Sequence, residues 1–216
     1  RQAAGPVAMG FVGLGVGTLS AYGRAGDLLR FYELDPQVID VAQRHFTYLG
    51  ASRAAIEFVI GDARLSLERE LSRGGPRGYD VLAIDAFSSD SIPVHLITRE
   101  AIELYARHLA PDGIIAVHIS NRFLDLKPVL ANIARATGLA AQLVSDSPQD
   151  DRTASSTDWV LLARDPAVLG DPQIAGRAEP LDPVPGFSLW TDQFNNLLDV
   201  LKVRPIDELR ALLGLG

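Results

Sequence analysis

A glycine-rich turn between two apolar runs constrains the fold of this chain more than any other feature of its sequence. Residues 7–12 are apolar enough for a buried parallel strand, and the turn Gly13–Gly17 lets the backbone bend sharply and approach a ligand. A helix that follows such a turn points its N-terminal N–H groups at the ligand. Leu28–Leu34 reads as the next strand and carries Glu33, 20 residues beyond Gly13. Nucleotide-binding α/β folds place at this position the carboxylate that accepts hydrogen bonds from ribose hydroxyls.

Strand and helix patterns alternate along the rest of the chain. Five more apolar runs predict strands at Ile56–Ile60, Tyr79–Ile84, Ile114–Ile119, Ala140–Val144 and Trp159–Ala163. Helical spacing lies between most of these runs, as after Asp35-Pro36, where an N-cap residue precedes proline at the first helical position. This alternation predicts a Rossmann-like, doubly wound α/β sheet of seven strands with helices on both faces. No helical pattern separates the last two strands, so we expect them to form an antiparallel pair.

Length and composition favour one large domain. The 216 residues are 47% hydrophobic, which suits a single substantial core spanning residues 1–216. Residues 165–186 are rich in proline and lack periodicity, and short helices are expected at Phe194–Val200 and Pro205–Leu212. We therefore interpret residues 165–216 as a C-terminal extension packed on the core. No apolar run approaches the roughly 20 residues that a membrane span needs, so a soluble, cytoplasmic chain is expected.

Charge and residue usage exclude several classes of function. The net charge is −7 and basic residues are scattered singly, so the chain lacks the electropositive stripe of a nucleic-acid-binding protein. Cysteine is absent and the four histidines have no ligand spacing, so we expect no metal site. His118 ends the predicted fifth strand, and a structural role is favoured over a role in a cleft.

Four acids follow the ends of predicted strands. They are Glu33, Asp62, Asp85 and, in the loop beyond, Asp90. Ligands of open parallel sheets collect at the carboxyl ends of the strands, so these acids predict one acidic cleft. Glu33 would hold a ribose, and Asp62 could accept a hydrogen bond from an adenine amino group. Asp85 and Asp90 are then left to face the reacting group.

Several motifs together resemble the spermidine synthase family of polyamine aminopropyltransferases. They are Gly13-Leu14-Gly15-Val16-Gly17, Glu33-Leu34-Asp35, Gly61-Asp62-Ala63 and Asp85 followed by Ser88-Ser89-Asp90. The closest resemblance is to the spermidine-synthase-like domain of transporter-fused members, carried by Asp85–Leu96 and Trp190–Leu198. It covers nearly the whole chain and implies the sheet of S-adenosylmethionine-dependent methyltransferases. The site residues that follow are Gly13, Gly15, Gly17, Glu33, Leu34, Asp62 and Ala63 for the cofactor, and Asp85 and Asp90 for catalysis.

The resemblance implies a reaction and its partners. An aminopropyl group would move from decarboxylated S-adenosylmethionine, a co-substrate rather than a prosthetic group, to a diamine such as putrescine. Asp85 would be the base, and Asp90 would hold the distal ammonium of the diamine. The partners are then small-molecule nucleotide and amine substrates, and the family context adds a homodimer. Membrane segments upstream of Arg1 would make the chain the cytosolic domain of a membrane protein.

Three departures from the family pattern keep other functions open. Ala86 and Phe87 interrupt the compact Asp-Ser-Ser-Asp loop, and Ser145–Asp158 contains no tyrosine where the family has one. The family's N-terminal β-hairpin domain is absent from this sequence. The chain could instead be a methyltransferase that uses intact S-adenosylmethionine, or a non-catalytic nucleotide-binding or sensor domain. An acid pair beside the sulfonium favours the decarboxylated donor, because Asp85 would repel the carboxylate of the intact one.

Overall fold

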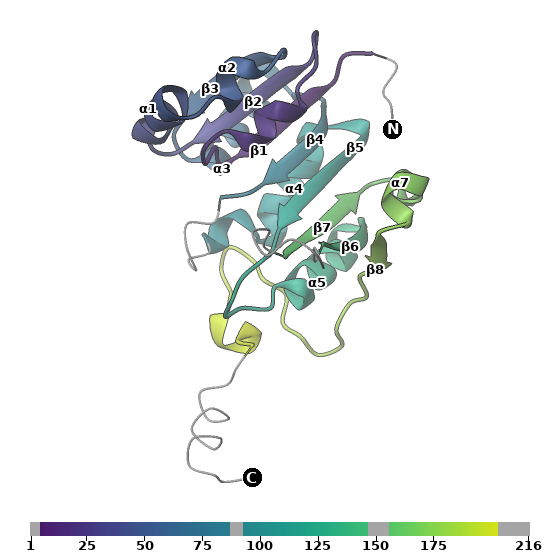
Figure 1. The fold of residues 1–216 in the computed structure, drawn as a ribbon. Helices are drawn as coiled ribbons and strands as arrows, with labels where there is room; N and C mark the ends of the chain where they lie inside the picture. The colour runs from purple at the N-terminus through teal and green to yellow at the C-terminus, as the bar shows by residue number, and fades with distance from the viewer. Residues whose placement is uncertain (1–4, 87–92, 147–155, 203–216) are drawn as a thin grey trace.

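The computed structural model describes residues 5–86, 93–146 and 156–202 (Figure 1). These residues form one mixed sheet with the strand order β3-β2-β1-β4-β5-β7-β6-β8. The strands are β1 (Ala8–Val12), β2 (Leu28–Glu33), β3 (Ala55–Ile60), β4 (Tyr79–Ile84), β5 (Leu109–His118), β6 (Ala140–Asp146), β7 (Thr157–Ala163) and β8 (Ala178–Pro180). The helices are α1 (Pro36–His45), α2 (Tyr48–Ala51), α3 (Ala63–Gly74), α4 (Arg99–His108), α5 (Lys127–Thr137), α6 (Pro166–Leu169) and α7 (Pro172–Ala175), with 3-10 turns η1 (Thr18–Tyr22), η2 (Val94–Leu96) and η3 (Leu197–Val200). The predicted residue Asp90 and the predicted helix Pro205–Leu212 lie outside the described residues.

The parallel half of the sheet positions the predicted site. β1 lies between β2 and β4 and runs parallel to both, with Phe11 opposite Phe31 on one side and Ala83 on the other. This confirms that the first and fourth predicted strands are parallel neighbours. The carboxyl ends of β1 to β5 consequently meet at one edge of the sheet. The strand order reverses between β1 and β4, which is where ligands of open α/β sheets bind.

The other half of the sheet is antiparallel and contains one strand that was not expected. β7 pairs with both β5 and β6 in antiparallel register, so the predicted hairpin is confirmed. The prediction of seven strands is wrong, because β8 pairs with β6, with Glu179 opposite Leu143. A strand of three residues leaves no periodic pattern in the sequence, yet it covers the edge of β6 that would otherwise present unpaired backbone groups.

Three further differences from the expected elements are local. The segment 165–186 contains α6 and α7, each begun by an aspartate N-cap with proline at the first helical position. Of the expected helix Phe194–Val200, only the last four residues are helical, as the 3-10 turn η3. β5 begins at Leu109 rather than Ile114, and its pairing with β4 shifts register between Tyr79 and Val81. The sequence did not predict this irregular start of the strand, because Pro111 and Gly113 are residue types that indicate a turn.

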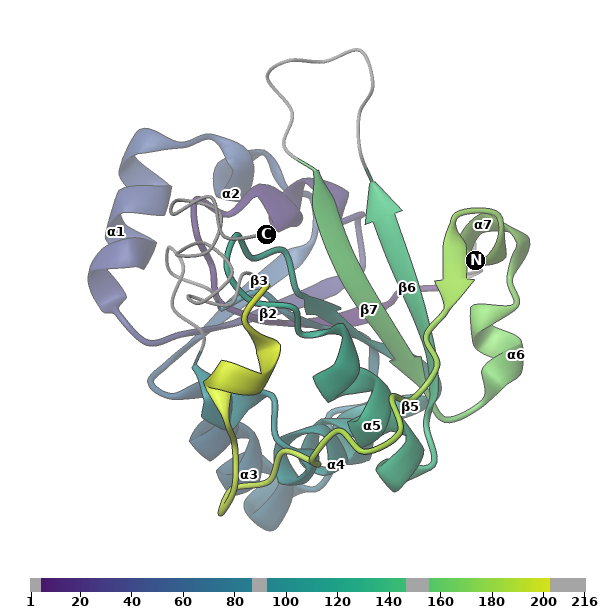
Figure 2. The same cartoon turned by 90° about the horizontal axis from the view of Figure 1, so that it is seen from below.

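Helices cover both faces of the sheet, as the alternation predicted. One face packs Phe11, Leu29 and Phe31 beneath α1, α2 and η1. The opposite face packs against α3, α4 and α5, and Figure 2 shows these helices together on their side of the sheet. Trp190 of the C-terminal extension is fully buried in this second cluster, and its carbonyl accepts the Arg99 N–H at the start of α4. Within the described part of the chain, no helix has both the length and the apolar character to cross a membrane.

Candidate active site

A pocket of about 410 Å³ opens at the carboxyl ends of β1 to β4. It brings together seven of the residues singled out from the sequence, namely Gly13, Gly15, Glu33, Leu34, Asp62, Ala63 and Asp85. Gly17 does not line the pocket, and Asp90 lies outside the described residues. The structure adds Pro93, His95 and Leu96, which follow the end of the β4 loop and form one wall. The pocket therefore occupies the edge that the strand order predicts.

The glycines of the first turn have different physical roles. Gly13 has a φ of 95°, and a Cβ there would lie 2.3 Å from the Asp85 carbonyl oxygen, so only glycine lets the turn pass the end of β4. Gly15 has a φ of 55° and no atom within 4 Å of a Cβ position, which leaves open space beside its backbone. A Cβ on Gly17 would lie 2.9 Å from Leu49 Cγ. Gly17 thus serves the packing of η1 against α2 rather than the pocket.

The Glu33 carboxylate is held at the end of β2 by two backbone groups. Its Oε2 accepts the Leu14 N–H at 3.0 Å, and its Oε1 accepts the Asp35 N–H at 3.0 Å. These bonds tie the glycine turn to the start of α1 and fix the plane of the carboxylate. A carboxylate oxygen accepts more than one hydrogen bond, so each retains capacity for a ligand hydroxyl. The geometry suits a carboxylate that receives two neighbouring hydroxyl groups.

Asp62 caps α3 and is paired with a histidine that the sequence did not reveal. Its Oδ1 accepts the Leu65 N–H at 2.9 Å, and its Oδ2 accepts a hydrogen bond from His95 Nε2, also at 2.9 Å. Burial acts to raise the pKa of Asp62, but these hydrogen bonds outweigh it and hold the pKa below its ordinary value. Asp62 is therefore anionic at neutral pH, and His95 lies beside it at the pocket wall.

The C-terminal extension braces this wall through Asp192. The Asp192 carboxylate accepts hydrogen bonds from both terminal nitrogens of Arg64, at 2.6 and 2.5 Å, and from Thr98 Oγ1 at 2.7 Å. The bonds from Arg64 hold the pKa of Asp192 below its usual range, against a smaller opposing effect of burial. The same arginine donates to the His95 carbonyl at 2.8 Å. A residue 128 positions further along the chain than Arg64 thus supports the histidine beside Asp62.

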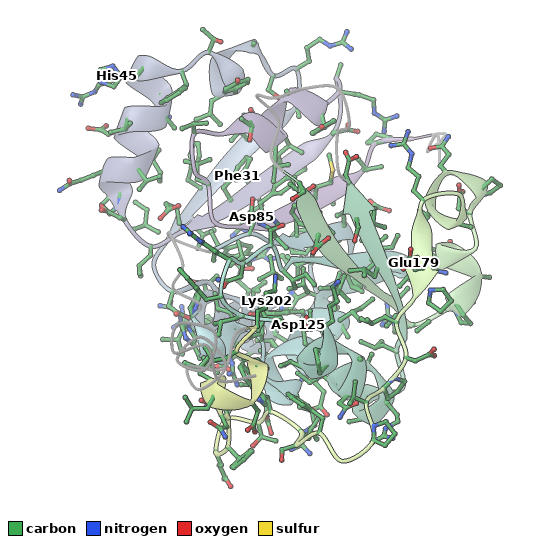
Figure 3. All side chains as sticks on the ribbon, turned by 60° about the horizontal axis from the view of Figure 1, so that its bottom comes forward. Phe31, His45, Asp85, Asp125, Glu179 and Lys202 are labelled. Atoms are coloured by element: carbon green, nitrogen blue, oxygen red, sulfur yellow. The ribbon has the colours of Figure 1, made fainter. Side chains whose placement is uncertain are left out.

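Asp85 follows β4 and lines the pocket, and Figure 3 labels its side chain. Its Oδ1 is 2.8 Å from His118 Nδ1, on the neighbouring strand β5. His118 is not among the residues that line the pocket, but it contacts the one predicted catalytic residue that the structure describes. The sequence favoured a structural role for His118 and did not predict this pairing, because nothing in the sequence specifies the register between β4 and β5.

The charge around the pocket is strongly one-sided. Among the described residues that line it, Glu33, Asp35, Asp62 and Asp85 are acidic, and none is lysine or arginine. Leu34 is 71% exposed and adds an apolar surface beside these acids. Within the described ranges, no three His, Cys, Asp or Glu side chains are grouped to hold a metal ion. The pocket therefore suits an organic cation with an apolar part.

Comparisons with curated proteins give two partial matches, and no protein-family model matches the chain. The chain is 32% identical over 95 residues to a polyamine aminopropyltransferase from Vibrio vulnificus, a match that covers 44% of this chain and 29% of that protein. It is 33% identical over 108 residues to an N-terminal histidine N-methyltransferase from Emericella nidulans, covering 50% of this chain and 19% of that protein. The matched region thus spans less than a third of either relative.

Solved structures share the fold over more of the chain. A probable spermidine synthase from Corynebacterium glutamicum has a TM-score of 0.62 at 20% identity, covering 91% of this chain and 76% of that one. Human methyltransferase-like protein 13 in complex with SAH has a TM-score of 0.58 at 21% identity, covering 80% and 81%. A spermidine synthase in complex with the transition-state analogue AdoDATO has a TM-score of 0.54 at 16% identity, covering 99% and 70%.

The fold is therefore the α/β transferase fold that spermidine synthases and methyltransferases share. The partial match to a polyamine aminopropyltransferase and the likeness to spermidine synthase structures agree with the resemblance that the motifs predicted. The relatives on which this rests are transferases.

Proposed function

We propose that the chain is an aminopropyltransferase that uses decarboxylated S-adenosylmethionine and a diamine such as putrescine. The observation that carries the proposal is that the pocket at the strand ends has four carboxylates and no lysine or arginine among its described lining residues. The decarboxylated donor carries a sulfonium and an ammonium and has no carboxylate. Four acids attract such a dication, and they also attract a protonated diamine.

The nucleoside part of the donor is assigned to the half of the pocket made by β1, β2 and β3. Glu33 accepts hydrogen bonds from both ribose hydroxyls, because the Leu14 and Asp35 N–H groups fix its orientation. Asp62 accepts a hydrogen from the adenine amino group through a remaining lone pair. Leu34 and Ala63 provide apolar contacts beside the base, and the backbone of the glycine turn approaches the donor. Structural neighbours support an S-adenosylmethionine-related ligand, because they hold AdoDATO or SAH.

The chemical step is a direct displacement. The amine nitrogen attacks the methylene carbon next to the sulfonium and forms a C–N bond. The C–S bond breaks, and sulfur keeps the electron pair as the neutral thioether 5′-methylthioadenosine. Because the sulfonium is already a good leaving group, the protein must mainly align the reactants and remove an ammonium proton. Asp85 takes this proton, since it faces the pocket from the end of β4, and Asp90 is assigned to the distal ammonium from its place in the sequence.

A methyltransferase that uses intact S-adenosylmethionine is the second candidate. The fold shared with human methyltransferase-like protein 13 and the partial match to a histidine N-methyltransferase favour it. The intact donor, however, brings a carboxylate into a pocket whose described lining offers no lysine or arginine to pair with it. The charge of the pocket therefore favours the decarboxylated donor.

A donor comparison tests the proposal. The protein is incubated with putrescine and either donor, and the products are measured by mass spectrometry. We expect 5′-methylthioadenosine and spermidine from the decarboxylated donor, and no S-adenosylhomocysteine from the intact one. Formation of S-adenosylhomocysteine with an amine or peptide acceptor would establish the methyltransferase instead. Binding of 5′-methylthioadenosine without turnover of either donor would identify a nucleotide-binding or sensor domain. The homodimer and the upstream membrane segments stay predictions from the resemblance, and a cytoplasmic location stays a prediction from the sequence.

A further inference from the structure

Behind the pocket, Asp85 is the first member of a chain of hydrogen bonds that runs across β5 to β7. Asp85 Oδ1 lies 2.8 Å from His118 Nδ1, and His118 Nε2 lies 2.8 Å from Ser120 Oγ. Ser120 Oγ in turn accepts the Asp158 N–H at 2.7 Å. The chain thus connects the predicted base to the backbone of an antiparallel strand on the far side of β5.

The bonds in this chain have a consistent direction. An ionised Asp85 only accepts, so the hydrogen between it and the imidazole belongs to His118 Nδ1. In a neutral imidazole Nε2 is then the acceptor, so Ser120 donates its hydrogen to Nε2 while a lone pair of Oγ accepts the Asp158 N–H. Both contacts thus favour the tautomer with the proton on Nδ1, and Ser120 supports it from the other side of the ring.

The imidazole is also held in place by packing. His118 lies opposite Trp159 in the β5–β7 pairing, and the two rings stack with centroids 4.8 Å apart. The His118 side chain is 21% exposed, so solvent reaches it only in part. Asp85 Oδ1 is consequently bound to a ring that two strands orient, while Oδ2 has no hydrogen-bond partner among the described residues.

We propose that His118 is a positioning residue that holds the Asp85 carboxylate with Oδ2 turned toward the pocket, and that Ser120 keeps His118 in the required tautomer. This inference rests on the proposed function for the step in which Oδ2 takes the ammonium proton. His118 does not itself touch the reactants. The Nδ1–H bond to Oδ1 stays in place while Oδ2 gains the proton, so the base keeps its orientation throughout the step.

Two amide substitutions separate the two hydrogen bonds of the ring. His118→Asn keeps an N–H donor at the place of Nδ1 and loses the contact with Ser120. His118→Gln places its amide where Nε2 was and loses the contact with Asp85. If positioning is the role, His118→Gln lowers kcat by about 100-fold, the cost of a misplaced reacting group, whereas His118→Asn stays within about tenfold of the parent. The affinity for 5′-methylthioadenosine is expected to be the same in both, and melting temperatures check that both fold.

The imidazole tautomer gives a readout that does not depend on turnover. Nitrogen-15 NMR of the histidine rings, with His118 assigned by its loss in His118→Asn, should show a protonated Nδ1 and an unprotonated Nε2 in the parent. The double variant Asp85→Ala/Ser120→Ala should lose this preference, because both contacts of the ring are removed. A parent His118 protonated on Nε2, or an unchanged signal in the double variant, would overturn the inference. If the parent has the expected tautomer but transfers no aminopropyl group, the hydrogen-bonded arrangement stands and the proposed function fails. Equal loss of kcat in His118→Asn and His118→Gln would assign His118 a purely structural role.

Discussion

Glu33→Gln is the substitution that tests the nucleotide assignment most closely. The change keeps the size of the side chain but replaces one carboxylate oxygen with an NH2 group. The NH2 group donates hydrogen bonds and accepts none, so it cannot receive a ribose hydroxyl. Whichever oxygen it replaces, it also faces a backbone N–H, that of Leu14 or that of Asp35. A hydrogen bond to a charged group is worth about 1.5–3 kcal/mol, so the Kd for 5′-methylthioadenosine should rise by about 10- to 150-fold.

The expected change in ligand-induced stabilisation follows from this affinity. At a ligand concentration of about 100 times the parent Kd, binding stabilises the folded parent by about 2.7 kcal/mol. For 216 residues this is a rise in Tm of about 5–11 °C. A Kd that is weaker by about 100-fold leaves about 0.4 kcal/mol, or a rise of about 1 °C. Calorimetric titration measures the same difference as Kd.

Two controls make the result specific. Glu103→Gln makes the same chemical change on α4, where Glu103 is half exposed and 3.8 Å from Arg99, and it should leave the affinity unchanged. The 2′-deoxy form of the nucleotide should bind the parent more weakly and Glu33→Gln with little further loss, because the variant no longer receives both hydroxyls. Equal affinity of Glu33→Gln and parent, or equal losses on removing the hydroxyl, would refute the assignment of Glu33 to the ribose.

Three further predictions concern stability. Hydrogen bonds from Arg24 lower the pKa of Asp27 to about 2, so this carboxylate stabilises the fold above its unfolded pKa and loses that effect as pH falls from about 4 through about 2. Asp27→Asn should cost about 1–3 kcal/mol in denaturant unfolding at pH 7 and much less at pH 2. Gly13→Ala should lower Tm far more than Gly15→Ala, since both carry the cost of about 1–2 kcal/mol for a left-handed backbone but only the first places Cβ against a carbonyl oxygen. Asp192→Asn should cost about 1 kcal/mol, less at 1 M salt, because its ion pair is partly exposed.

The parts of the fold that local patterns encode were predictable from the sequence. Apolar runs between glycine and proline signals gave the parallel strands, and Asp35 caps α1 through the Gln37 N–H with Pro36 at the first helical position, as expected. The acids at the strand ends were brought to one pocket because parallel strands place their carboxyl ends at the same edge. That rule predicted the positions of Asp85 and Glu33, whereas their proposed roles came from the spacing after the glycine turn and from the family resemblance.

The contacts that support these acids could not be predicted, because they join segments far apart in the sequence. His95 and Asp62 are separated by 33 residues, and His118 and Asp85 by the same number. Each pair depends on the register of a strand or the path of a loop, which residue types do not specify. The edge strand β8 was not predicted for a different reason, because three residues are too few to show a periodic pattern.

Turnover by Asp85→Asn tests the central claim most directly. The substitution keeps the shape of Asp85 and removes the proton acceptor, and it leaves unchanged Glu33 and Asp62, the proposed contacts of the nucleoside. Asp40→Asn is the matched control, because Asp40 is an exposed member of an ion pair on α1. With decarboxylated S-adenosylmethionine and putrescine, we expect Asp40→Asn to form spermidine at the parent rate and Asp85→Asn to form none, with 5′-methylthioadenosine affinity unchanged in both. Spermidine formation by Asp85→Asn at the parent rate would contradict the account.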